Sequence, residues 1–487
     1  MILQLNHLQG KQAGASAQDV VSAVYSLLQE GYLDDSQFAN LRVHLDWVQY
    51  RQNFREVVAV TPCVNDRGEN SSLMEIHVDT RQVVPGALRE QLLCAVAGAN
   101  PGAHAELGRM PDRIYLEEFG SFRNSIAWQF NKLYWHRLAD WERATGKGYE
   151  QALPGGKSDA NHPEAIADCV ADFWTLLRDL ETKNQLPPEI FALEIGVGLG
   201  TRSQIWLDRF RALDAERGTK YYSRVKFLLG DYSLATLDRS RPALRDHLDL
   251  CSFIVLDALD PGKTLSFLRH KILHVHLTNV YDNLPDEEFA RRDGRLHLVQ
   301  VRAYLPNSEA ARIAKAANVP IQEINTTIRR LLDAGPEFLG DRARGVSFWQ
   351  EVWKAVRLEE RLIPVEDLPD VELPAGLNST HLEEILEGAP SDFRFHMSSG
   401  ALESFRNTLP LLHPRGFLQV QDIFVTSLQD YRLGFHGPGK LDGSIVNWVN
   451  GVLLREVGER AGYDVHFAPF RYREGSRTSI LYTTQRE

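Results

Sequence analysis

Cysteine and long apolar runs are both scarce in this sequence of 487 residues. Its four cysteines are far apart and form no Cys-x-x-Cys pair, which argues against a disulfide framework and a cysteine zinc site. No run of about 18 apolar residues could cross a membrane, and a net charge of −11 leaves no basic stripe for a nucleic-acid backbone. The N-terminal stretch has one lysine, no arginine and Asp19, unlike a secretory signal or an Arg-rich transit peptide. We expect a soluble, cytoplasmic protein that binds neither membrane nor nucleic acid.

Helical metal-binding patterns are also missing. No His-x-x-x-His or Glu-x-x-His pair on a predicted helix supports a metal site. His274 and His276 share one face of a predicted inner strand, because side chains two residues apart point the same way. We expect both to be buried structural groups, and we expect no metal.

Three alternating glycines are the clearest positive signal. Residues 191–201 read Phe-Ala-Leu-Glu-Ile-Gly-Val-Gly-Leu-Gly-Thr, an apolar strand that meets an acid and then a glycine turn, with a helical pattern following. Gly196, Gly198 and Gly200 remove side chains where the backbone must bend sharply and approach a ligand closely. In the dinucleotide fingerprint the third glycine comes three places after the second, but here that place is Thr201.

Three further predicted strands also end in polar clusters. The strand at 225–230 ends in Asp231-Tyr232-Ser233, the strand at 253–256 in Asp257-Ala258, and the strand at 272–277 runs into residues 278–285. An acid after the second strand is where a ribose diol needs a two-oxygen acceptor, although Asp231 could instead be the neighbour of a helix N-cap. In open α/β sheets ligands bind at the carboxyl ends of the strands, so these clusters should converge on one crevice.

The pattern acid-x-Gly-x-Gly-x-Gly resembles the first motif of class I S-adenosylmethionine-dependent methyltransferases. Glu194–Thr201 and Asn279–Pro285 are similar to the Glu-x-Gly-Pro-Gly-x-Gly-Thr and Asn-Glu-Phe-Phe-Asp-Ala-Leu-Pro motifs of the MidA-like methyltransferases. That family includes a protein-arginine methyltransferase needed for respiratory complex I assembly. Val197 stands in place of the family's proline, and Asn279 aligns with an acid that could hold a guanidinium. The resemblance covers about residues 120–290 and the C-terminal end.

The resemblance implies S-adenosylmethionine as the cofactor. It places Glu194 at the methionine end, Asp231 at the ribose and Asp257 near the adenine amino group. The other residues expected at the cofactor are Gly196, Gly198, Gly200, Thr201, Tyr232, Ser233, Ala258 and Asn279. Asp282, Asn279 and Tyr281 are expected to face the methyl group as catalytic residues, with Asp282 as the base. The alternative is that Asp282 caps the turn before Pro285 and that Asn279 ties the strand end to the loop.

The expected fold is α/β, a seven-stranded Rossmann-like methyltransferase sheet with a closing antiparallel hairpin at 463–470 and 478–484. Residues 1–118 form an N-terminal α+β region, 119–187 an aromatic-rich helical region, 188–305 and 406–487 the methyltransferase domain, and 306–405 a helical cap insertion. Within these regions we predict helices at 16–31, 35–54 and 121–141.

The methyl acceptor is expected to be a protein side chain or a bulky small molecule. The resemblance favours an arginine, whose guanidinium Asp282, Glu287 and Glu288 could hold. The acceptor would enter between the helix at 121–141, the cap and the loop at 279–285. Two other classes stay open. A nicotinamide-dependent oxidoreductase would want glycine at Thr201, and a non-catalytic cofactor-binding or assembly protein would keep the pocket without turnover.

Overall fold

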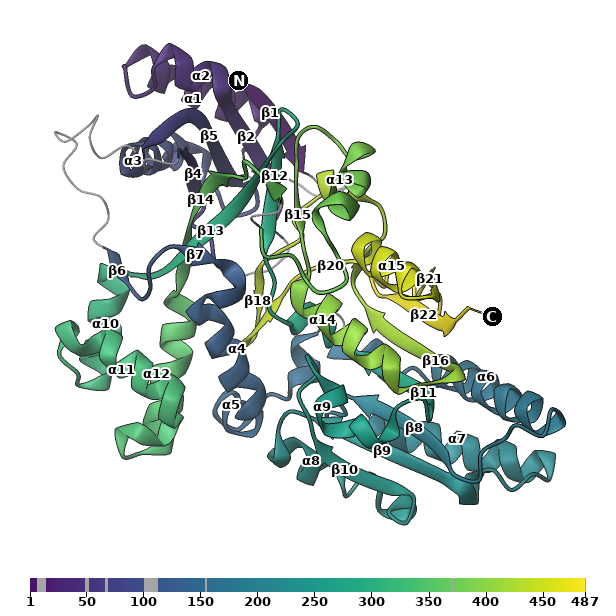
Figure 1. The fold of residues 1–487 in the computed structure, drawn as a ribbon. Helices are drawn as coiled ribbons and strands as arrows, with labels where there is room; N and C mark the ends of the chain where they lie inside the picture. Colours follow the sequence, from purple (N-terminus) through teal and green to yellow (C-terminus); the bar gives the residue numbers. More distant parts are fainter. Residues whose placement is uncertain are drawn as a thin grey trace.

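The computed structural model describes residues 1–6, 15–48, 52–65, 69–99, 113–153, 156–368 and 371–486. Two sheets organise the described chain, one at the top and one at the lower right of Figure 1. The lower sheet has the strand order β10-β9-β8-β11-β16-β22-β21. Its strands are β8 (Ile190–Ile195), β9 (Val225–Asp231), β10 (Cys251–Val255), β11 (Ile272–Thr278), β16 (Leu412–Asp422), β21 (Tyr463–Pro469) and β22 (Ser479–Gln485).

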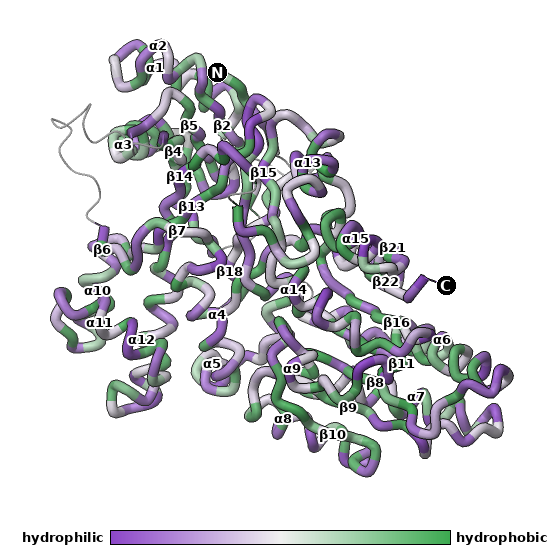
Figure 2. The backbone as a smooth tube through the Cα atoms, in the orientation of Figure 1, coloured by the Kyte–Doolittle hydropathy of each residue, from purple (hydrophilic) through white to green (hydrophobic). Residues whose placement is uncertain are grey.

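The lower sheet is parallel from β10 to β16, and β22 runs antiparallel to both β16 and β21. Alternate residues of its strands face two separate cores: Ala192 and Phe227 pack under α6 (Pro163–Thr182) and α7 (Thr201–Arg217), whereas Leu193 and Leu228 face α14 (Ser399–Thr408) and α15 (Gly451–Arg460). Apolar residues dominate β8 and β9 accordingly (Figure 2). Because helices cover both faces, the α/β class predicted from the sequence is confirmed.

The upper sheet combines strands from the predicted N-terminal region with strands from the middle of the chain. Its order is β1-β2-β5-β4-β14-β13-β12-β15, with β6 and β7 also paired to β13. The strands are β1 (Ile2–Asn6), β2 (Leu41–Asp46), β4 (Val58–Val64), β5 (Asn70–Asp79), β6 (Arg113–Tyr115), β7 (Gly120–Ser121), β12 (Glu288–Arg292), β13 (Arg295–Pro306), β14 (Arg357–Pro364) and β15 (Phe393–His396). Figure 1 shows the purple N-terminal strands lying beside the green strands from the middle of the chain.

This arrangement corrects the predicted boundaries. The segment 306–405 does carry helices, α10 (Asn307–Ala317), α11 (Ile324–Ala334), α12 (Arg342–Ala355) and α13 (Ser379–Glu387), yet β14 and β15 anchor it in the N-terminal sheet, so it is not a purely helical cap. Likewise β12 and β13, which were assigned to the methyltransferase domain, belong to the upper sheet. In β14 Leu358 and Leu362 are separated by charged residues, which made a strand resemble a solvated helix.

Two predicted helices also differ. The helix expected at 35–54 ends at Asn40, and β2 begins at Leu41 with every residue buried. In β2 polar and apolar residues alternate although both faces are buried, and its polar Arg42 and His44 looked like the solvated face of a helix. The helix expected at 121–141 is interrupted at Arg137 and forms α4 (Ile126–His136) and α5 (Leu138–Thr145).

The remaining elements are short or peripheral. They are the helices α1 (Ala17–Gln29), α2 (Asp35–Asn40), α3 (Leu88–Ala99), α8 (Leu234–Ser240) and α9 (Pro261–Leu265), and the strands β3 (Gln52–Asn53), β17 (Phe424–Val425), β18 (Gly439–Leu441), β19 (Ser444–Val446) and β20 (Val449–Asn450). Among the described helices, none combines the length and the apolar character that a membrane crossing requires.

Candidate functional site

The carboxyl ends of the parallel strands lie on one line. The register places Ile195 of β8 beside Gly230 of β9 and Leu277 of β11, while Val255 of β10 lies beside Asp231. The predicted polar clusters begin within a few residues of this line. The four strand ends therefore border one edge of the lower sheet, where an α/β sheet binds its ligands.

The glycine turn after β8 has left-handed backbone at three positions, with φ of 80° at Gly196, 53° at Gly198 and 77° at Gly200. A Cβ atom on Gly196 would lie 2.6 Å from the Val280 side chain, and one on Gly200 would lie 3.0 Å from Cβ of Ser240. A Cβ atom on Gly198 would meet nothing within 4 Å. The outer two glycines are thus required by the protein's own neighbours, whereas Gly198 borders open space that a ligand can fill.

Glu194 is 4 % exposed and is held by the first turn of α7, which starts at Thr201. Its Oε2 accepts hydrogen bonds from Arg202 at 3.1 Å and from the Ser203 hydroxyl at 2.6 Å. These bonds fasten the start of α7 to the end of β8 and fix the shape of the glycine turn. The contact of Glu194 with the methionine end of a cofactor stays a prediction.

Asp231 ends β9 as a partly buried acid, and burial raises its pKa to about 6. Its Oδ1 accepts the Ser233 backbone N–H at 3.0 Å. Ser233 is the residue that caps α8, through its hydroxyl and the Thr236 N–H. Asp231 is therefore the neighbour of the N-cap, as the alternative predicted, and it is also placed at the sheet edge. Tyr232 lies beneath the Lys132 ammonium, 5.4 Å from the ring centroid.

The cluster after β10 is more open. Asp257 is exposed, and its Oδ1 accepts the Leu259 backbone N–H at 2.9 Å. Ala258 is partly buried against the core of the lower sheet. Both stand next to the Asp231 strand end, as expected for the adenine side, and their contact with a ligand stays a prediction.

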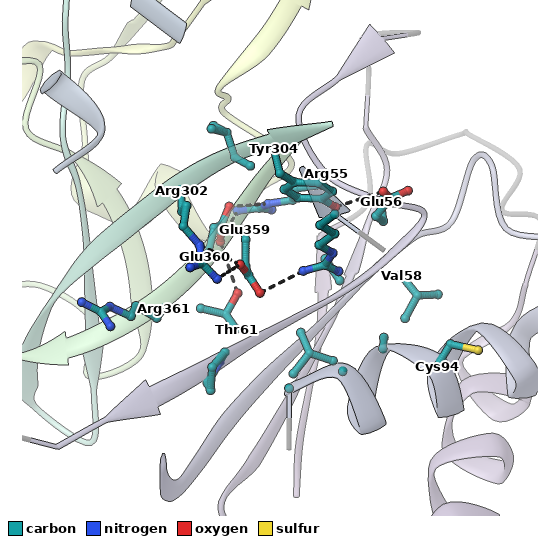
Figure 3. Close-up of a pocket in the computed structure, with 18 of the residues that line it drawn as sticks. Arg55, Glu56, Val58, Thr61, Cys94, Arg302, Tyr304, Glu359, Glu360 and Arg361 are labelled. Atoms are coloured by element: carbon teal, nitrogen blue, oxygen red, sulfur yellow. Dashed lines mark hydrogen bonds and ion pairs between the residues drawn. The ribbon is translucent and has the colours of Figure 1, made fainter. Parts of the chain in front are cut away.

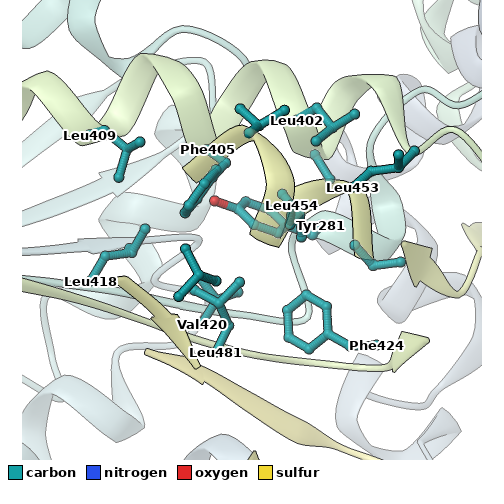
Figure 4. Packing of buried hydrophobic residues seen from close by; sticks show 14 of the residues in the cluster. Tyr281, Leu402, Phe405, Leu409, Leu418, Val420, Phe424, Leu453, Leu454 and Leu481 are labelled. Carbon is teal, nitrogen blue, oxygen red and sulfur yellow. The ribbon is translucent and has the colours of Figure 1, made fainter. Parts of the chain in front are cut away.

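Tyr281 does not belong to the crevice. Its ring is 2 % exposed and lies among apolar side chains, including Leu402 and Phe405 of α14 and Val420 of β16 (Figure 4). This burial raises the pKa of its hydroxyl. The prediction that Tyr281 faces the methyl group is wrong, because the tight turn after β11 directs this side chain under the helix.

Asn279 has the left-handed φ of 51° that asparagine tolerates. Its backbone N–H donates to the Gln421 carbonyl at 3.0 Å, and its carbonyl accepts from the Asn283 side chain at 3.3 Å. These bonds tie the end of β11 to β16 and to the following loop, which is the structural role given as the alternative. The half-buried Asn279 side chain is left at the same edge as the glycine turn.

A second acid accompanies Asp282. Asp422 at the end of β16 is fully buried and accepts three backbone N–H groups, those of Tyr281 at 2.9 Å, Asp282 at 3.3 Å and Ile423 at 2.8 Å. Burial raises the pKa of Asp422 to about 7, and burial together with the Asp422 charge raises the pKa of Asp282 well above its usual range. Two neighbouring buried carboxyls resist double ionisation, so this pair retains a proton that an isolated carboxyl would lose.

Sequence reasoning did not select Asp422, because the strand predicted at 417–425 continues past it with apolar residues. It also missed Tyr149, at the start of a short helical turn (Tyr149–Ala152). Burial and then the charges of Asp282 and Asp422 raise the pKa of Tyr149, so its hydroxyl lies within electrostatic reach of the acid pair. The Tyr149 ring packs edge-on against Trp135, with centroids 5.0 Å apart.

Helix α4 is hydrogen-bonded to the loops that follow β9 and β11. The Asn131 side chain donates to the Asn283 carbonyl at 2.9 Å and accepts the Ile445 N–H at 2.9 Å. At the end of the helix, the Ser233 hydroxyl donates to the His136 carbonyl at 3.3 Å. Most aromatic residues of this region, such as Phe130, pack in a core with α10–α12.

The acids proposed to hold a guanidinium are dispersed. Glu288 lies 3.4 Å from Arg394 in the upper sheet, and Glu287 is bonded to the Ser399 hydroxyl. Asp282 is therefore left without these two partners at the crevice.

A separate cavity of about 830 Å3 opens between β4, α3 and β14 (Figure 3). The guanidinium groups of Arg302 and Arg361 each lie 4.3 Å from the centroid of the Phe119 ring, and Arg302 is 2.7 Å from Glu359. The sequence predicted no site there, because its residues come from distant segments of the chain.

No family model matches the chain, and no curated protein matches it. Among solved structures, a candidate methyl transferase from Burkholderia thailandensis bound to S-adenosyl-homocysteine is 14 % identical, with a TM-score of 0.43 over 80 % of this chain and 92 % of that one. A native structure of an uncharacterized protein of the COG1565 superfamily, from the same organism, is 13 % identical, with a TM-score of 0.42 and the same coverage. The trans-methyltransferase CalH with S-adenosyl-homocysteine is 13 % identical, with a TM-score of 0.28 over 61 % and 52 %.

Proposed function

We propose that the chain is an S-adenosylmethionine-dependent methyltransferase whose cofactor lies across the glycine turn. The observation that carries the proposal is the open space at Gly198, beside strand ends that bring Asp231 and Asp257 to the same edge. Such a cofactor supplies a methyl group that is already activated by its sulfonium. Gly198 and Asn279 would line its methionine end, Asp231 would accept from the ribose hydroxyls, and Asp257 would lie near the adenine.

The chain's own contribution to the reaction is alignment and proton transfer. Helix α4 is bonded to the loops that follow β11 and β9, which limits how an acceptor can approach the strand ends. The pKa of Asp422 is raised to about 7 and that of Asp282 well above its usual range, so the pair is a stronger proton acceptor than two isolated carboxylates. An acceptor that must lose a proton on methylation suits this pair.

The acceptor is a bulky small molecule or a protein side chain that reaches Asp282 past Tyr149. A small molecule is favoured over arginine, because Glu287 and Glu288 have partners elsewhere and leave no bidentate carboxylate set beside Asp282. A non-catalytic cofactor-binding protein is the second candidate, and a turnover assay separates the two.

Thermal unfolding with S-adenosylmethionine, S-adenosylhomocysteine or NAD tests the cofactor class. A ligand that binds only the folded state adds about 2.7 kcal/mol at one hundred times its dissociation constant, so the two sulfur compounds should raise Tm and NAD should not. A rise with NAD alone would refute the proposal.

A matched pair of variants tests the position of the site. Gly198→Asn keeps a residue that tolerates left-handed backbone and fills the open space, so affinity for S-adenosylhomocysteine should fall at least about tenfold. Gly218→Asn is the control, since Gly218 caps the other end of α7 with a φ of 67° and nothing within 4 Å. Equal affinities of the two variants by calorimetry would place the ligand elsewhere.

A further inference from the structure

A cluster of buried polar residues lies in the upper sheet, away from the glycine turn. Parallel strands β2 and β5 carry Arg-x-His-x-Asp at 42–46 and Glu-x-His-x-Asp at 75–79, with His44 directly beside His77. Residues two apart point to the same face, so both histidines and Glu75 share one surface of the sheet. His44, Glu75 and His77 are 4, 0 and 4 % exposed.

The possible ligand atoms of His44, Glu75 and His77 all lie within 4.8 Å of one another. His77 Nε2 lies 3.3 Å and His44 Nε2 lies 3.7 Å from Oε2 of Glu75. Two ligands about 2.0–2.1 Å from a tetrahedral zinc ion lie about 3.4 Å apart. His44 Nε2 is buried and has no hydrogen-bond partner, which is a cost that a bound cation would remove.

The groups that surround these three side chains also suit a metal site. His77 Nδ1 is 3.1 Å from Oδ2 of Asp46, the carboxylate–histidine contact that orients a ligand nitrogen toward a metal. Glu75 is bonded through its other side to Arg292, and Arg394 lies 3.1 Å from Oε2. The guanidinium groups fix the plane of the carboxylate, and Oε2 lies between Arg394 and the two imidazoles.

The charge balance leaves room for a cation. The ion-pair network around Glu75 joins four carboxylates to three guanidinium groups. The carboxylates are those of Asp46, Glu75, Glu288 and Glu360, and the guanidinium groups are those of Arg55, Arg292 and Arg394. With both imidazoles neutral, the network carries one uncompensated negative charge, which is costly to bury.

The cluster also borders a small polar cavity of about 50 Å3, lined among others by His44, His77, His396 and His436. This volume holds a water molecule with space to spare. From these observations we propose that His44, Glu75 and His77 bind a divalent transition-metal ion of the zinc class, with a fourth position open to water or a small ligand from the cavity. Two imidazoles and one carboxylate are donors that suit zinc rather than calcium or magnesium.

Cobalt titration of the untagged full chain, after dialysis against a chelator, tests the site. One Co2+ should bind per chain with the visible absorption of a tetrahedral ion, and His44→Ala and His77→Ala should each weaken binding about 100-fold or more. His276→Gln is the control, because His276 is equally buried but lies in the lower sheet, bonded to Gln419. It should leave binding unchanged.

Absence of Co2+ and Zn2+ binding by the folded wild-type chain would overturn the proposal, as would equal binding by the two alanine variants and the wild type. The rival explanation is that a protonated His77 bridges Asp46 and Glu75 without metal, which predicts that first result. Should the alanine variants fail to fold, X-ray absorption of the zinc-loaded wild type decides. Two imidazole nitrogens in the first shell support the site, and a sulfur or all-oxygen shell overturns it.

Discussion

The raised pKa of Asp231 makes cofactor affinity dependent on pH in a way that can be worked out. With its pKa at about 6, the carboxyl is about 10 % ionised at pH 5 and about 90 % ionised at pH 7. A ribose diol donates two hydrogen bonds and therefore requires the ionised form. The dissociation constant for S-adenosylhomocysteine should fall about tenfold from pH 5 to pH 7 and level off above it.

Calorimetry across this pH range, in two buffers of different ionisation enthalpy, measures both the affinity and the proton released on binding. Asp231→Asn should abolish the part of the slope centred near pH 6 and weaken binding at pH 7.5 by about 1–3 kcal/mol, because a charged acceptor is replaced by an amide. Asp422, whose pKa is raised to about 7, is another group that titrates nearby, so Asp422→Asn measures its share. An unchanged slope in Asp231→Asn would refute the assignment of the ribose to Asp231.

The same residue should affect stability in the opposite direction. An acid whose pKa is raised on folding binds more protons in the native state, so the free energy of unfolding falls as pH rises from about 4 to about 6. Without ligand, Asp231→Asn should therefore melt at a higher temperature than the wild type above pH 6.

Three other substitutions test the catalytic base, the anchoring of α4 and the packing of the lower sheet. Asp282→Asn should lower turnover about 10²–10⁴-fold with S-adenosylhomocysteine affinity unchanged, and equal turnover would remove Asp282 as the base. Asn131→Ala breaks the two bonds of the Asn131 side chain, to Asn283 and to Ile445 of β19, and should cost about 1–3 kcal/mol in urea unfolding, whereas Asn325→Ala, at a half-buried residue of α11, removes a single bond and serves for comparison. Trp206→Ala, which empties a fully buried site among Phe173, Phe210 and Phe227, should cost about 3–5 kcal/mol, and a loss under 1 kcal/mol would contradict the packing described.

The lower sheet was predictable because its signals are local. Each of its inner strands is a short apolar run followed by a polar residue, and the glycine turn at 196–200 needs no distant partner to be recognised. Asp231 and Gly198 were found in this way, whereas Asp422 was not selected because apolar residues follow it in the sequence. Tyr281 was misplaced because the direction of a side chain in a tight turn depends on tertiary packing, here against α14.

Strand β2 of the upper sheet was not predicted from the sequence, because its polar side chains are buried. In β2 the side chains of Arg42, His44 and Asp46 alternate with apolar ones, yet both faces are buried. Their charges are satisfied by partners far along the chain, such as Asp392 for Arg42. A single sequence contains no local sign that such a polar row faces another part of the protein rather than water.

The long segment of chain between β11 and β16 should affect the order in which the two sheets fold. These two strands are hydrogen-bonded neighbours in the lower sheet, but the whole of β12–β15 and α10–α14 lies between them in sequence. Closing so long a loop costs more entropy than closing a short one, and a compact intervening segment shortens the effective loop. That segment in turn completes its own sheet only against β4 and the N-terminal strands. Nascent chains should therefore assemble the upper sheet before the lower one closes, and a chain lacking residues 1–79 should leave β14 as an unpaired edge prone to aggregation.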